Sequence, residues 1–128
     1  MTLVVDASAL VAIGLREPEA VAFSQALLMD DDCLAAPINL VEAGIVLSGR
    51  WPDFTEGGYR SWLRQLNVSG APVEHEPALA AYIRYGKGRH PARLNLGDCF
   101  AYALAMQLHA PLLFKGDDFA LTDVKRAI

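Results

Sequence analysis

Short apolar runs recur along this chain, and stretches with helical spacing lie between them. The runs Leu3–Val5, Cys33–Ala36 and Pro111–Phe114 are typical of buried strands, and a weaker strand is expected over Ala71–Glu74. Helices are expected over Ala7–Leu15, Pro18–Leu28, Ile38–Leu47, Tyr59–Leu66, Pro77–Tyr85 and Leu96–His109. Short strands that alternate with helices form βα units, in which helices cover both faces of a parallel sheet. We therefore expect an α/β fold, a three-layer α/β/α sandwich with a central parallel sheet, as one domain over residues 1–128.

The composition narrows the classes of protein that remain. With 128 residues, of which 53% are hydrophobic and 20% charged, the chain can bury a substantial core. The net charge of −4 argues against a broad basic face for nucleic acid, so any contact with nucleic acid must be local. No stretch approaches the roughly 20 apolar residues that cross a bilayer. Because the first apolar run also lacks a basic leader, we expect a cytoplasmic location and no membrane partner.

Three of four candidate acids fall close to the carboxyl ends of the strands, where a parallel sheet binds its ligands, and the loop before the fourth, Asp98, must return to the same edge. Asp6 directly follows the first strand, and Asp117 follows the last. Glu42 lies about one turn into the helix fed by Cys33–Ala36, and Asp98 begins the most apolar helix of the chain. We expect these four carboxylates to converge.

Each acid also has a purely structural interpretation, and three of these interpretations are strong. Asp6 can cap the first helix, Asp98 can form a capping box with Asn95, and Asp117 can make a turn. Glu42 differs, because its helix is apolar on nearly every side and should be buried. A buried acid is rare unless it is paired or binds a cation, and no basic partner lies nearby in the sequence.

A cluster of four carboxylates requires positive charge among them, because their mutual repulsion otherwise destabilises the fold. Oxygen ligands without clustered His or Cys favour Mg²⁺ or Mn²⁺. Such ions support phosphodiester hydrolysis by activating water and by neutralising the phosphate. The residues themselves therefore indicate a metal-dependent hydrolase.

Four segments carry a resemblance to a known family. They are Val4–Leu10 (VVDASAL), Asn39–Ala43 (NLVEA), Leu94–Ala105 (LNLGDCFAYALA) and Leu112–Phe119 (LLFKGDDF). With these segments the chain resembles PIN-domain proteins, specifically the VapC toxins of bacterial toxin–antitoxin pairs. The resemblance implies an endoribonuclease that uses Mg²⁺ or Mn²⁺ and cuts RNA of the translation machinery, of the tRNA or rRNA class. It also implies a homodimer that is inhibited by a VapB-type antitoxin.

The resemblance assigns roles to individual residues. Asp6, Glu42 and Asp98 match the three core metal-binding acids of the family. Asp117 matches the fourth acid, with the adjacent Asp118 as the alternative. Ser8 matches the hydroxyl position after the first acid, where it would orient a ligand or water, although a helix-capping role fits it as well. Asn95 would support the site from the start of the last long helix.

One segment, Arg84–Arg93, is strongly basic, and it leads directly to Asp98. Lys87, Arg89 and Arg93 would hold RNA phosphates beside the metal site. The alternative is a solvated, flexible loop without a role in binding.

Other classes fit the sequence less well. A receiver-type signalling domain would use Asp6 and Lys115, but the chain lacks the acidic pair after the first strand, a central strand that ends in Asp, and a proline after Lys115. A phosphatase with an aspartyl nucleophile needs D-x-D, where this chain has D-x-S. A PIN-like module that binds RNA or a partner without cutting ranks below the nuclease, because all the candidate acids are present.

Overall fold

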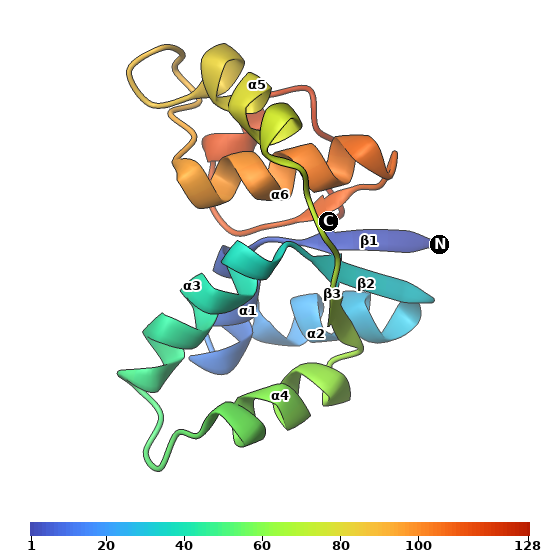
Figure 1. Ribbon diagram of the computed structural model, residues 1–128. Helices are drawn as coiled ribbons and strands as arrows, with labels where there is room; N and C mark the ends of the chain where they lie inside the picture. The colour runs from blue at the N-terminus through green and yellow to red at the C-terminus, as the bar shows by residue number, and fades with distance from the viewer.

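A computed structural model describes all residues, 1–128, and its centre is a four-stranded parallel sheet. The strands are β1 (Thr2–Val5), β2 (Asp32–Ala35), β3 (Val68–Gly70) and β4 (Leu112–Leu113), in the order β3-β2-β1-β4. Every pairing is parallel, with Leu3 opposite Cys33 and Val4 opposite Leu112. The carboxyl ends of all strands therefore meet at one edge of the sheet (Figure 1).

Six helices cover the two faces of this sheet. They are α1 (Ala7–Gly14), α2 (Ala20–Met29), α3 (Pro37–Ser48), α4 (Glu56–Gln65), α5 (His75–Tyr85) and α6 (Leu96–Gln107), followed by the short 3-10 helix η1 (Asp118–Leu121). Figure 1 shows α5 and α6 on one side of the sheet and α1, α2 and α4 on the other, while α3 contacts both α1 and α6. The expected three-layer α/β/α arrangement is confirmed. None of the helices is long and apolar enough to cross a membrane.

The central strand β1 divides the core into two halves. Successive strand residues point to opposite faces, so Val4 packs with α5 and α6, while Leu3 and Val5 pack with α1 and α2. All three side chains are buried. Because β1 is packed on both faces, its last residue delivers Asp6 to a fixed point between the two layers.

The strand expected over Ala71–Glu74 is wrong, because the third strand lies just before it at Val68–Gly70. Val68 is buried opposite Cys33 and provides the apolar contact that holds this edge strand. Ala71 N makes one further bond to Ala35 O, at 2.9 Å. Pro72 follows directly and has no N–H to continue the ladder, so the chain leaves the sheet there.

The expectation that the helix over Ile38–Leu47 is buried on nearly every side is also wrong. Helix α3 buries Asn39, Ala43 and Leu47, while Val41 and Ile45 are 59% and 66% exposed. The helix lies at the periphery, where it packs against α1 and α6, and the Tyr59 hydroxyl of α4 donates to Leu40 O at 2.6 Å. Glu42 is accordingly half-buried.

Candidate active site

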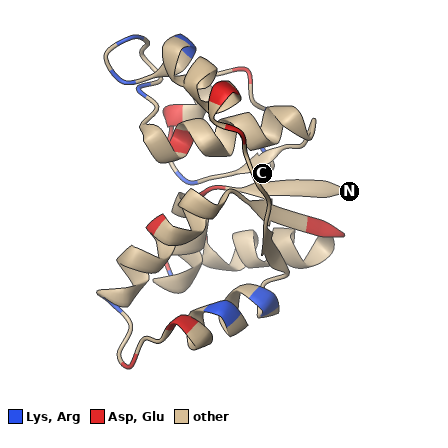
Figure 2. Ribbon diagram, viewed as in Figure 1, with Lys and Arg blue, Asp and Glu red and all other residues tan.

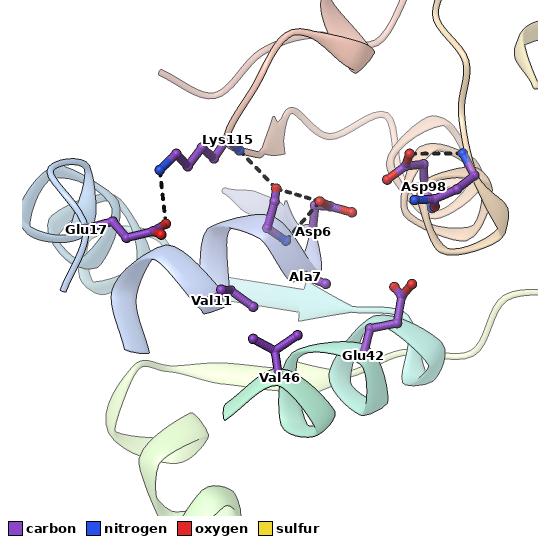
Figure 3. Close-up of a pocket in the computed structure, with 10 residues that line it drawn as sticks. Asp6, Ala7, Val11, Glu17, Glu42, Val46, Asp98 and Lys115 are labelled. Atoms are coloured by element: carbon purple, nitrogen blue, oxygen red, sulfur yellow. Dashed lines mark hydrogen bonds and ion pairs between the residues drawn. The ribbon is translucent and has the colours of Figure 1, made fainter. Parts of the chain in front are cut away.

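A pocket of about 480 Å³ opens at the carboxyl ends of the strands. It is lined by Asp6, Ala7, Ser8, Val11, Glu17, Glu42, Val46, Asn95, Asp98 and Lys115. Figure 3 shows that the carboxylates of Asp6, Glu42 and Asp98 point into the same space from the start of α1, from α3 and from α6. The structure thus brings together three of the four acids predicted from the sequence, with Ser8 and Asn95 beside them.

Asp6 is only 3% exposed and caps α1. Its Oδ2 accepts hydrogen bonds from Ser8 N, at 3.0 Å, and from Ser8 Oγ, at 2.6 Å. Ser8 Oγ also accepts from Lys115 N, at 3.0 Å, so one hydroxyl links the ends of β1 and β4. The capping interpretation of Asp6 is correct, and the residue lines the pocket all the same.

Asp98 likewise takes part in a helix cap and lines the pocket. Its Oδ2 accepts from Asn95 N at 3.0 Å, and Asn95 Oδ1 accepts from Asp98 N at 2.8 Å, which completes a capping box at the start of α6. These bonds fix the carboxylate of Asp98 at the wall of the pocket.

Glu42 is held by two residues to which we assigned no role from the sequence. Asn39 Nδ2 donates to Glu42 Oε1, at 3.1 Å, and the same nitrogen donates to Gly97 O, at 3.0 Å. The Glu42 carboxylate lies in the space that a side chain at Gly97 would occupy. The spacing of Asn39 and Glu42, three apart on one helix, could have indicated the contact, but no sequence signal connects Glu42 with Gly97.

Negative charge dominates the pocket. Burial raises the pKa of Asp6, against the opposing effect of its bonds from Ser8. Burial raises the pKa of Asp98 to about 7, and the charges of Asp6, Asp118 and Glu42 act in the same direction. Neither acid forms an ion pair, so no cationic side chain offsets these effects.

Lys115 is the only cationic side chain that lines the pocket, and other acids already hold it. Its Nζ pairs with Glu17 at 3.0 Å and with Glu19 at 3.5 Å, and both partners lie on the segment between α1 and α2. The position of Lys115 directly after an apolar strand could have indicated its place in the site. Its charge is directed away from the three carboxylates (Figure 3).

The donor set fits a hard divalent cation. The pocket offers carboxylate, amide and hydroxyl oxygens and has no His or Cys in its lining, which suits Mg²⁺ or Mn²⁺. The three carboxylates line the wall without closing around one point, and nowhere in the chain are three Asp, Glu, His or Cys side chains grouped tightly enough to form a ready-made cage. Mutual repulsion keeps such groups apart, and a cation would draw them together.

The structure does not place Asp117 on the wall of this pocket. Asp117 is exposed at the start of η1, where its side chain caps no N–H. The neighbouring Asp118 is near enough for its charge to raise the pKa of Asp98.

The basic residues Lys87, Arg89 and Arg93 also lie outside the pocket. All three are exposed, and none forms an ion pair. Their loop is closed at its base by bonds from Lys87 N to Leu94 O, at 2.9 Å, and from Leu94 N to Tyr85 O, at 3.0 Å. Figure 2 shows this segment as a blue loop beyond α5, at the end of the molecule opposite α4.

The sequence of this chain is similar to those of known proteins. The model of the PIN domain family matches residues 3–125. Ribonuclease VapC of Mycolicibacterium smegmatis is 45% identical over an alignment that covers 95% of this chain and 97% of the relative. Ribonuclease VapC30 of Mycobacterium tuberculosis is 43% identical over 95% of each chain, and Ribonuclease VapC28 of the same species is 37% identical over 98% of each.

Proposed function

Because this chain belongs to the PIN-domain family, and within it to the VapC toxins, we propose that it is a metal-dependent endoribonuclease. Its substrate is RNA of the translation machinery, of the tRNA or rRNA class. Membership of this family is incompatible with the receiver and phosphatase alternatives. The remaining alternative is a PIN-like module that binds RNA or a partner without cutting.

One observation carries the proposal, namely three carboxylates from separate elements that line one pocket without a free cation among them. Asp6, Glu42 and Asp98 would hold Mg²⁺ or Mn²⁺. When bound, the ion supplies a Lewis acid that activates water and neutralises charge on the phosphate. No nucleophilic side chain is then required for hydrolysis.

The residues of the chain orient the donors of this site. Ser8 holds the carboxylate of Asp6, and Asn95 holds that of Asp98. From the sequence we proposed Asp117 as the fourth acid, with Asp118 as the alternative. Neither residue lines the pocket, and Asp118 is near enough for its charge to raise the pKa of Asp98.

The proposal extends to the partners of the protein. Lys87, Arg89 and Arg93 are exposed and unpaired, so their charges are available to RNA phosphates. The VapC family implies a VapB-type antitoxin and a cytoplasmic location. The exposed apolar side chains of Val41 and Ile45 are consistent with a homodimer.

Cleavage of total cellular RNA by the purified, antitoxin-free chain tests the proposal. The reaction is run with Mg²⁺, with Mn²⁺ and with a chelator, beside the variants Asp6→Asn and Asp98→Asn. We expect discrete fragments that require metal and disappear in both variants, since an amide keeps the shape of the side chain and removes its charge. Asp53→Asn, an exposed acid outside the pocket, is the matched control and should cut like the wild type.

Two results would contradict the proposal. Equal cleavage by Asp6→Asn and Asp98→Asn would trace the activity to a contaminant. A folded wild-type chain that binds RNA but cuts none at any metal concentration would be a binding module.

A further inference from the structure

Asn39 is the one polar side chain in the chain with no solvent exposure at all, and it lies directly behind the carboxylates of the pocket. We propose that Asn39 is a positioning residue that holds Glu42 and Asp98 at the spacing that a divalent cation requires. The inference rests on the proposed function, because it concerns the same metal site.

The amide nitrogen of Asn39 joins two elements of the site. One hydrogen goes to Glu42 Oε1, three residues further along α3, at 3.1 Å. The other goes to the carbonyl oxygen of Gly97 in the first turn of α6, at 3.0 Å. Gly97 directly precedes Asp98, so a single amide group sets the position of one acid relative to the other.

The orientation of the amide follows from these two acceptors. If the amide were turned over, its oxygen would face two other hydrogen-bond acceptors, the Glu42 carboxylate and the Gly97 carbonyl oxygen, and no N–H would lie between them. In the orientation observed, Asn39 Oδ1 is buried and accepts no hydrogen bond. The oxygen and the nitrogen of a buried amide normally both form hydrogen bonds. In Asn39 only the nitrogen does, and its two bonds hold Glu42 and α6.

Gly97 provides the space in which the Glu42 carboxylate lies. Any side chain at this position would overlap the Glu42 carboxylate, so the absence of one lets the carboxylate lie against the backbone of α6. Asn39 engages Oε1 and leaves Oε2 available to an ion. Hydrogen-bond partners behind carboxylate ligands orient those ligands, and their loss typically weakens metal binding 10- to 100-fold.

Binding of Mn²⁺ to the RNA-free protein tests the role of Asn39 without relying on activity. Free Mn²⁺ is measured by electron paramagnetic resonance during titration of the wild type, Asn39→Ala and Asn39→Leu. The leucine variant keeps most of the side-chain volume and removes both N–H donors, so it serves if the alanine variant does not fold. We expect about tenfold weaker Mn²⁺ binding in either variant, and we expect cleavage to recover toward the wild-type rate at high Mn²⁺.

Coupling to Glu42 separates positioning from general stability. In a Glu42→Gln background, Asn39→Ala should weaken Mn²⁺ binding little further, because the carboxylate that it orients is gone. Gly97→Ala should weaken Mn²⁺ binding as Asn39→Ala does, because the added methyl group would displace the Glu42 carboxylate from its position against α6. Asn67→Gly is the matched control, since the amide of Asn67 also donates to two backbone carbonyls, of Leu27 and Asp30, but lies outside the pocket.

The outcomes distinguish a failure of the positioning role of Asn39 from a failure of the metal site. Wild-type affinity for Mn²⁺ in the folded Asn39 variants, or an equal loss with and without Glu42, would overturn the positioning role and leave the nuclease intact. A wild-type chain that binds no Mn²⁺ would overturn the metal site itself, and the inference with it.

Discussion

At the scale of single residues, the pocket is built from side chains that have two tasks each. Asp6 and Asp98 cap helices through Oδ2, and both line the pocket. The structural and functional interpretations of these acids are compatible, because a carboxylate has two oxygens and several lone pairs. An acid at the head of an apolar helix is thereby fixed in place by the helix that it begins.

The first prediction concerns the pH dependence of the metal-free protein. The folded-state pKa values of Asp6 and Asp98 are raised above the ordinary value of 3.8, that of Asp98 to about 7. Between pH 4 and pH 7 the folded state therefore binds more protons than the unfolded state, so the free energy of unfolding falls as the pH rises through this window. Thermal unfolding in chelator should give a lower Tm at pH 8 than at pH 5.

The variant Asp98→Asn provides the control for that prediction. It removes the charge that is destabilised at high pH, so its Tm should depend less on pH, and at pH 8 it should exceed the Tm of the metal-free wild type. Mg²⁺ should raise the wild-type Tm at pH 8 and leave that of the variant nearly unchanged. A wild-type Tm that rises between pH 5 and pH 8 in chelator would contradict the prediction.

The second prediction concerns Ser8, whose hydroxyl donates to Asp6 and accepts from Lys115 N. Ser8→Ala removes both bonds, one of them to a charged group, and should lower the free energy of unfolding by about 2 kcal/mol. It should also raise the pKa of Asp6 further, because the bonds from Ser8 lower it. Urea unfolding measures the loss, and Ser8→Thr, which keeps the hydroxyl, should restore most of it.

At the scale of elements, local patterns predicted the type of each helix well and failed where tertiary position decides. The strand expected at Ala71–Glu74 lies at Val68–Gly70, because the pairing of Val68 with β2 is a long-range contact that no local pattern reveals. The exposure of Val41 and Ile45 has the same origin. A helix that is apolar on all sides can lie at the periphery of the chain when a second copy of the protein covers its exposed side.

The residues of the site show the same contrast between local pattern and tertiary position. The positions of Asp6, Glu42 and Asp98 were predictable from the βα pattern, because Asp6 follows a strand, Glu42 lies about one turn into the helix after a strand, and Asp98 lies in the first turn of a helix. The contacts of Asn39 with Gly97 and of Lys115 with Glu17 join residues far apart in the chain, so they depend on the folded arrangement alone.

The third prediction concerns the start of α6. Asn95→Ala removes the acceptor for Asp98 N and breaks the capping box, which should cost about 1 kcal/mol of unfolding free energy. Asn95→Ser retains a capping oxygen and should keep most of the stability. Equal stability of the alanine variant and the wild type in urea unfolding would show that the cap contributes nothing to α6.

At the scale of the whole molecule, the charge distribution poses a problem for an RNA-cutting protein. The net charge is −4, and the pocket adds carboxylates at the point where the phosphate must approach. Positive charge free of acidic partners is available in the loop that carries Lys87, Arg89 and Arg93 (Figure 2). Because this loop leads directly into α6, RNA held by the loop would lie beside the helix that carries Asp98.

The fourth prediction follows from that arrangement. In an Asp98→Asn background, which prevents cleavage, replacing Lys87, Arg89 and Arg93 with Gln should weaken RNA binding. If each residue contacts one phosphate of unpaired RNA, the slope of log K against log salt should become shallower by about 2. Fluorescence anisotropy with labelled RNA measures both quantities. The salt concentration is varied from about 50 to about 300 mM, where counterion release dominates.

A second triple variant separates local contact from overall charge. Replacing Arg50, Arg60 and Arg64 with Gln removes three exposed cations, one from the turn after α3 and two from α4, so the net charge changes by the same amount at a different place. A general field effect would weaken RNA binding equally in the two variants, since both proteins carry the same net charge. Contact at the loop instead predicts a shallower salt slope for the Lys87, Arg89 and Arg93 variant alone. Equal slopes in the two triple variants would make the loop a solvated connection between α5 and α6.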